Sequence, residues 1–144
     1  MNSLVDMLHQ GGYSLVMRTA TGEVHTFTRR GVADLHSLYH ESGNPLQGAS
    51  IADKVVGIGA AALMVASGIA KCHTDVISTG ALQLLQDAGV KYSYGSEVPE
   101  IINRTGTGRC PLETRLAPFG SDIAAMLPEI DRFVTEMAAR TLNS

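Results

Sequence analysis

The sequence has few cysteines, little net charge and no long hydrophobic run. Its two cysteines, Cys72 and Cys110, could form one disulfide, but no export signal is recognisable at the N-terminus, so we expect free thiols and a cytoplasmic location. The longest apolar stretch, residues 55–66, contains two glycines and is shorter than the roughly 20 residues that a membrane span requires. The net charge of −3 offers no general attraction for phosphate backbones. We therefore expect neither a membrane protein nor a nucleic-acid binder.

The composition is that of a globular protein. Hydrophobic residues make up 44% of the chain and charged residues 17%, far from the composition of disordered chains. A length of 144 residues is sufficient for one core without disulfide or metal staples. We predict a single domain over residues 1–144, with an N-terminal helix at 1–12 and a C-terminal helix at 121–144 that is kinked or restarted at Pro128.

The first third of the chain predicts a hairpin and a short helix. The segment "YSLVMRTATGEVHTFT" has two β-rich runs around a turn at Thr21 and Gly22. The next segment, "GVADLHSLYHESG", has its apolar residues at helical spacing before Gly43. His36 and His40 stand four residues apart there, as metal ligands do, but no third ligand with recognisable spacing accompanies them. We interpret them as a surface pair and expect no metal or other cofactor.

A central helix is predicted over "GASIADKVVGIGAAALMVASGIAK". Its apolar residues repeat at steps of four and three from Ile51 to Ile69, and Ser50 with Asp53 forms a capping-box pattern that places the helix start. The run "GIGAAA" after "DKVV" also mimics a dinucleotide-binding fingerprint. We set that interpretation aside because the strand it needs would be very short.

The segments "CHTDVIS", "TGALQLLQDAG" and "VKYSY" predict a strand, a helix and a second strand. Such a βαβ unit makes its two strands parallel, so the fold class is α/β. The connection from Gly95 to Cys110 follows. A connection of that length in one domain is either functional or disordered.

The segment "NRTGTGRCPLE" closes this connection. Its glycines bring backbone N–H groups close to a ligand, and Arg104 and Arg109 supply forked donors for phosphate or carboxylate. Cys110 is expected at the N-cap of a short helix, with Pro111 at N1 and Glu113 at N3, where the helix dipole and Arg109 favour a thiolate. The segment is either an anion cradle beside a nucleophilic cysteine, or a solvated turn beside a small buried one.

Two further pairs of residues carry two interpretations each. Asp53 and Lys54 form an adjacent acid and base that either serve a site or act as a helix cap and an exposed lysine. Ser78 and Thr79 lie where a parallel strand passes into a helix, which is where open α/β sheets bind ligands, although they are also ordinary capping residues.

The segments "LHSLY", "GASIADKVVGIGAAALM", "DVIST" and "IINRTGTGRCPLE" resemble a family of uncharacterised prokaryotic proteins with a cytidine-deaminase-like fold. The resemblance spans residues 35–113. It implies a three-layer α/β/α sandwich around a central mixed sheet of four to five strands. Zinc deaminases of that fold carry H-x-E at the start of the central helix and P-C-x-x-C at the start of the next. The matching regions here read Ala52-Asp53-Lys54 and Ser78-Thr79-Gly80-Ala81, so no zinc ligand remains.

The resemblance implies that the pocket persists without its metal. Its expected ligand-binding residues are Ser78, Thr79, Asn103, Arg104, Thr105, Gly106, Thr107, Gly108 and Arg109. Our leading hypothesis is a small-molecule binding domain for a nucleotide-like or other anionic metabolite, with Lys54 completing the positive charge. An alternative is an enzyme that uses Cys110 as nucleophile with Asp53 and Lys54 in the pocket. A further alternative is a regulatory or interaction protein with a vestigial pocket. The oligomeric state, homo-oligomers included, is left open.

Overall fold

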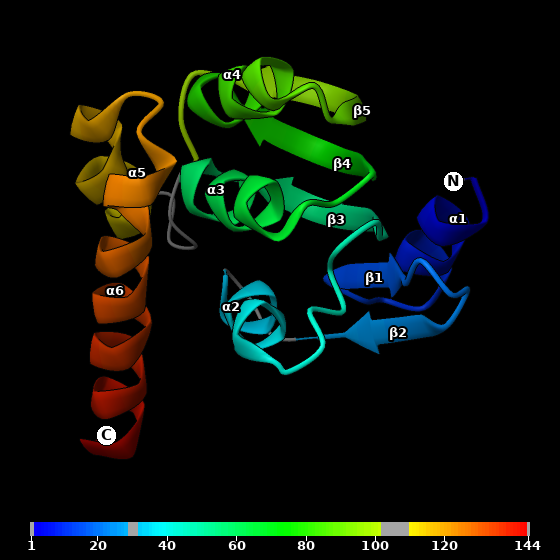
Figure 1. Ribbon diagram of the computed structural model, residues 1–144, viewed down its shortest axis with the longest axis horizontal. Helices are drawn as coiled ribbons and strands as arrows, with labels where there is room; N and C mark the ends of the chain where they lie inside the picture. The colour runs from blue at the N-terminus through cyan, green and yellow to red at the C-terminus, as the bar shows by residue number, and fades with distance from the viewer. Residues whose placement is uncertain (1, 29–31, 102–109, 144) are drawn as a thin grey trace.

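The computed structural model describes residues 2–28, 32–101 and 110–143. It shows a five-stranded mixed sheet with helices on both faces (Figure 1). In chain order the elements are α1 (Asn2–Gln10), β1 (Leu15–Arg18), β2 (Val24–Phe27), α2 (Ala33–His40), β3 (Ser50–Val56), α3 (Ile58–Ser67), β4 (Lys71–Ser78), α4 (Thr79–Ala88), β5 (Lys91–Val98), α5 (Pro111–Leu116), a 3₁₀ turn (Ala117–Phe119) and α6 (Ile123–Asn143). No helix among the described residues is both long and apolar enough to cross a membrane.

The strands lie in the order β2-β1-β3-β4-β5. The predicted hairpin is present, because β1 pairs antiparallel with β2, and β1 also pairs antiparallel with β3. The predicted parallel unit is present too, since β4 and β5 are parallel neighbours joined by α4. β3, which was not predicted, adds a third parallel strand beside β4 and is joined to it by α3. Gly89 ends α4 in the left-handed conformation, as the sequence predicts. The carboxyl ends of three adjacent strands therefore meet at one edge of the sheet.

The two faces of the sheet carry separate apolar clusters. On β1, Leu15 and Met17 join the larger cluster under α3, α4 and α6, whereas Val16 between them joins a smaller one with Leu4 and Leu8 of α1. This is the alternation expected of a strand covered on both sides. α1 packs mainly against β1 and β3, and its His9 reaches Asp75 of β4 at 2.9 Å. The α1 face of β4 and β5 is left without a covering helix among the described residues.

The predicted start of the central helix is wrong. Ser50 and Asp53 belong to strand β3. α3 begins only at Ile58, after this strand has ended. The apolar spacing that suggested one helix spans a strand and a helix separated by Gly57. The β-branched residues of "SIADKVV" favour the strand. The strand–glycine–helix arrangement that we set aside as too short is therefore the local structure that forms.

The parallel strands share an irregularity near their middle. Lys54 and Val55 are both exposed between buried Asp53 and Val56, so the alternation of faces is broken. Lys54 has no ladder partner in β4, although the register continues on both sides. The Asp53 side chain accepts a hydrogen bond from the Val55 N–H at 3.3 Å. Val55 is therefore exposed, and Val56 lies in the core at the carboxyl edge.

Candidate functional site

A pocket of about 520 Å³ lies at the carboxyl edge of the sheet. We call it the edge pocket. It is bordered by the first residue of α3, the first turn of α4, the segment after β5 and the α5 region, through Ile58, Thr79, Gly80, Gln83, Glu100 and Glu113 among others. Ligands of open α/β sheets bind at this edge, outside the carboxyl ends of the strands. A second, apolar groove of about 490 Å³, lined by Val55, Val76 and Val98, shares Pro99 and Glu100 with it. We call it the valine groove.

Glu113 organises this edge. Its side chain is buried, and its Oε1 atom accepts hydrogen bonds from the backbone N–H of Ile58 and, at 3.4 Å, from the Ser78 hydroxyl. Its Oε2 atom accepts from the Ile101 N–H at 3.4 Å. A helix N-terminus leaves backbone N–H groups unpaired and carries partial positive charge. The carboxylate from α5 therefore supplies an internal anion to the start of α3 and contacts the N-cap residue of α4.

Gly57 permits this arrangement. A Cβ atom on Gly57 would lie 2.6 Å from Glu113 Oε1, so a side chain there would displace the carboxylate. From the sequence, Glu113 is predicted only as a residue of the first turn of α5. Its position there is confirmed, with Cys110 at the N-cap and Pro111 at the first helical position. Its contact with α3 depends on the tertiary fold and leaves no spacing signal in the sequence.

Thr79 lines the edge pocket and Ser78, the residue before it, is buried, and the hydroxyls of both have internal partners. Ser78 Oγ caps α4 by accepting from the Ala81 N–H at 3.3 Å. Thr79 Oγ1 donates to Glu97 Oε2 at 2.9 Å and to the Val98 carbonyl at 3.2 Å. Ser78 is therefore a helix cap, as one of its two interpretations held, and Thr79 also lines the edge pocket.

Asp53 and Lys54 lie in β3, not at the start of the central helix. The pKa of Asp53 is raised to about 8, mainly by burial. Hydrogen bonds from the Val55 and Lys54 backbone lower this pKa, and the nearby charges of Asp34 and Asp75 raise it. Lys54 is exposed and its backbone N–H donates to the Ser14 carbonyl. The helix starts are occupied by Gly57-Ile58-Gly59 and Ser78-Thr79-Gly80, and neither offers a zinc ligand.

The two cysteines lie in different surroundings and are not bonded to each other. Cys110 is half-buried, packs against the larger cluster, and its backbone N–H donates to the Ile101 carbonyl at 2.8 Å. Cys72 is buried in β4, where desolvation, followed by the charge of Asp53, holds the pKa of its thiol well above the usual range. Neither the edge pocket nor the valine groove is lined by Asp53, Lys54 or Cys110.

The glycine–threonine segment lies outside the described residues. The predictions for Asn103, Arg104, Thr105, Gly106, Thr107, Gly108 and Arg109 therefore stay predictions. The described residues on either side of it, Ile101 and Cys110, are adjacent through the Cys110 N–H bond to the Ile101 carbonyl. The segment thus leaves and re-enters the described structure beside Glu113.

The interpretation of His36 and His40 as a plain surface pair is incomplete. Asp131 of α6 lies against both imidazoles, at 2.8 Å from His36 and 3.1 Å from His40. This third side chain comes from a position more than 90 residues away, so sequence spacing carries no signal for it.

These features define a small α/β domain with a mixed five-stranded sheet, in which two helix starts and a buried carboxylate meet at the carboxyl edge of the strands. The chain belongs to the family described as a domain of unknown function, DUF1893, whose sequence profile matches residues 3–126. It is similar to the crystal structure of a DUF1893 family protein (TM1506) from Thermotoga maritima. The TM-score is 0.78 at 24% identity, over 94% of this chain and 88% of that one. The likeness shows a shared fold. No curated protein matches the chain significantly.

Proposed function

We propose that the protein is a small-molecule binding domain whose ligand occupies the edge pocket, on a scaffold like that of the cytidine deaminases but without their zinc ligands. The observation that carries the proposal is the position of a pocket of about 520 Å³ at the carboxyl edge, against the first turn of α4. Pockets of this size and place are the usual ligand sites of open α/β sheets.

The deaminase-like part of the proposal is supported by the meeting of two helix starts. Deaminases hold their zinc between the starts of the central helix and the next one. Here Glu113 bridges the same two elements, from the Ile58 N–H to the Ser78 hydroxyl. At this edge the two helix starts are therefore joined by a protein carboxylate.

The described pocket lining favours an uncharged, nucleoside-like portion of a ligand. Its ionisable side chains are Asp87, Glu100 and Glu113, and no lysine or arginine lines it within the described part of the chain. The neighbouring valine groove supplies apolar surface for a planar ring. A phosphate would need cations from elsewhere, and the sequence offers Arg104 and Arg109. We therefore propose a nucleotide-like ligand whose base and sugar occupy the edge pocket.

A ligand panel tests this proposal. Nucleosides, their monophosphates, inorganic phosphate and a polyamine are compared by thermal shift, and the dissociation constant of the best ligand is measured by calorimetry. Gln83 is exposed and lines the pocket. Its truncation to alanine should raise the dissociation constant of the ligand about 3–10-fold, which corresponds to the loss of one hydrogen bond.

Gln86→Ala is the matched control. Both glutamines are exposed on α4 and each has one internal partner, Asp87 for Gln83 and Tyr92 for Gln86, but Gln86 does not line the edge pocket. The dissociation constant of the ligand for Gln86→Ala should equal that for wild type. Arg104→Ala should weaken binding of the monophosphate and leave binding of the nucleoside unchanged. Stabilisation by no compound, or equal weakening by the two glutamine variants, would contradict the proposal.

The enzyme alternative has one supporting observation, the half-buried thiol of Cys110 at the N-cap of α5. A nucleophilic cysteine needs a base or a cation close to its sulfur. Alkylation by iodoacetamide at neutral pH discriminates the two functions. Cys110 must react faster than a free thiol in solution for the enzyme alternative to stand, and an equal or slower rate removes it. Cys72, buried and held protonated, should stay unlabelled in the same experiment.

A further inference from the structure

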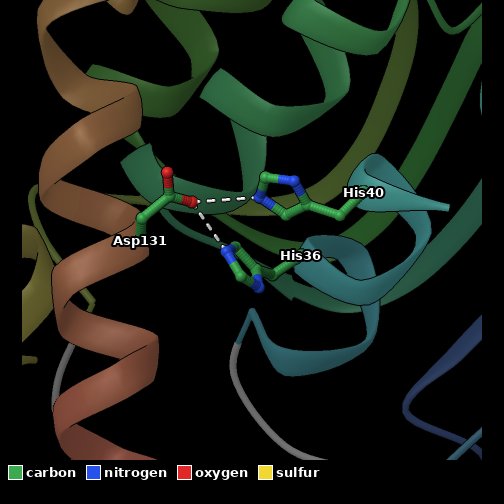
Figure 2. A group of neighbouring side chains, drawn as sticks. All are labelled: His36, His40 and Asp131. Carbon is green, nitrogen blue, oxygen red and sulfur yellow. Dashed lines mark hydrogen bonds and ion pairs between the residues drawn. The ribbon is translucent and has the colours of Figure 1, made fainter.

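His36, His40 and Asp131 form a cluster at the contact between α2 and α6, away from the edge pocket (Figure 2). The two histidines come from α2 and lie one helical turn apart, so their rings project from the same side of the helix. Figure 2 shows both Nε2 atoms directed at the same carboxylate oxygen of Asp131. The distances are 2.8 Å from His36 and 3.1 Å from His40.

We propose that this cluster is a binding site for a divalent transition metal of the zinc class, held by the Nε2 atoms of His36 and His40 and by the Asp131 carboxylate. Two imidazoles and one carboxylate are a donor set that suits Zn²⁺ and its neighbours in the first transition row. The same set suits Mg²⁺ and Ca²⁺ poorly, because these ions prefer oxygen ligands alone.

The spacing of the donor atoms fits such an ion. The three donor atoms all lie within 4.8 Å of one another. In a tetrahedral zinc site with bonds of 2.0–2.1 Å, two ligand atoms lie roughly 3.3 Å apart. The observed separations of 2.8 and 3.1 Å from Asp131 need to open by only a few tenths of an ångström to admit the ion.

The surroundings favour a cation with an open coordination position. Asp131 brings a carboxylate to the two imidazoles and so supplies negative charge to the cluster. The neighbouring Arg132 is directed to Glu129 and does not neutralise Asp131. The side chains of His40 and Asp131 are each 51% exposed, which leaves water access to a fourth ligand position. Three protein ligands with a fourth position left to water is the pattern of open zinc sites.

A second histidine–aspartate group provides an internal comparison. His9 of α1 lies 2.9 Å from Asp75, but His73 is 3.7 Å from the same carboxylate and its Nδ1 contacts the Ser93 hydroxyl at 2.8 Å. This group is looser, and one of its imidazoles is already engaged through its other nitrogen. It is the natural control for any effect that histidine near aspartate has in general.

The experiment uses the full chain without an affinity tag, after treatment with a chelator. Zn²⁺ is titrated in competition with a chromophoric chelator, and Co²⁺ is added separately to record its visible absorption, which reports coordination geometry. We expect one equivalent of Zn²⁺ bound. His40→Gln and Asp131→Asn should each raise the dissociation constant on the order of 100-fold or more, because each removes a direct ligand.

His9→Gln is the matched control and should leave the dissociation constant within about threefold of wild type, since it changes the looser group. Zn²⁺ should also raise the melting temperature of wild type and of His9→Gln, and not that of Asp131→Asn. Circular dichroism of each variant confirms that the fold is retained. Absence of binding by wild type, binding that survives in both cluster variants, or loss of binding in His9→Gln would each overturn the proposal.

Discussion

Asp53 and Glu113 are carboxyl groups that the fold removes from water, and they find different partners. Glu113 receives two backbone N–H groups and a hydroxyl. Asp53 receives the Val55 N–H and faces the negative charges of Asp34 and Asp75. Burial of a carboxylate is costly unless hydrogen bonds compensate it. The two residues should therefore respond differently to neutralising substitutions.

Asp53 should make the protein less stable as the pH rises. Its pKa goes from 3.8 to about 8 on folding, so between these values the folded protein keeps a proton that the unfolded chain releases. The stabilising contribution is then complete below pH 4 and is lost as the pH rises towards 8, with a slope of at most about 1.4 kcal/mol per pH unit. Urea denaturation at pH 5, 6, 7 and 8 measures this slope. Asp53→Asn should flatten it, whereas Asp6→Asn, an exposed change, should not.

Glu113→Gln should destabilise the protein by about 1–3 kcal/mol, because a charged acceptor that pairs with buried donors is replaced by a neutral amide. The free energy of unfolding in urea measures the loss. Glu23→Gln is the control, since the Glu23 side chain is 72% exposed and its change should stay within about 0.5 kcal/mol. Equal free energies for the two variants would show that the carboxylate does not stabilise the start of α3.

At the scale of elements, β4 and β5 have a tight backbone contact where their ladder is interrupted. Asp75 and Gly95 are not a ladder pair, and a Cβ atom on Gly95 would lie 2.8 Å from the Asp75 carbonyl oxygen. This contact is with backbone, which cannot rotate away as a side chain can. Glycine is therefore required by packing at this position of an exposed strand.

Gly95→Ala should destabilise the protein by about 1–3 kcal/mol, although the same substitution at an open position often stabilises by restricting the unfolded chain. Thermal unfolding measures the change. Ser96→Ala, on the next residue of the same strand, should have little effect because Ser96 is exposed. A neutral or stabilising Gly95→Ala would show that the two strands can separate at this point without cost.

At the scale of the whole molecule, the elements that local spacing determines are the ones the sequence predicts. The hairpin, α2, and the parallel unit from β4 to β5 follow from turn glycines and short-range alternation. The boundary between β3 and α3 was missed because a strand and a helix happened to place Ile51, Val55 and Ile58 at helical intervals. The Glu113 contact and the Asp131 cluster join elements distant in sequence, so only the fold brings them together.

The two apolar clusters on opposite faces of the sheet should unfold as one unit. Both depend on β1, which gives Val16 to the smaller cluster and Leu15 and Met17 to the larger. Leu8 is fully buried in the smaller cluster, and Leu8→Ala should cost about 2–5 kcal/mol. Because β1 and β3 are shared, this loss should lower the stability of α3 as much as that of α1.

Hydrogen exchange measures the two helices separately in one sample. The slowest amides of α1 and of α3 should lose equal protection in Leu8→Ala, and Leu85→Ala, which changes the larger cluster, should have the same uniform effect. If Leu8→Ala lowers the protection of α1 amides alone and leaves α3 amides as protected as in wild type, α1 opens independently. The sheet would then be held chiefly by the larger cluster, and α1 would be an attached element rather than part of the cooperative fold.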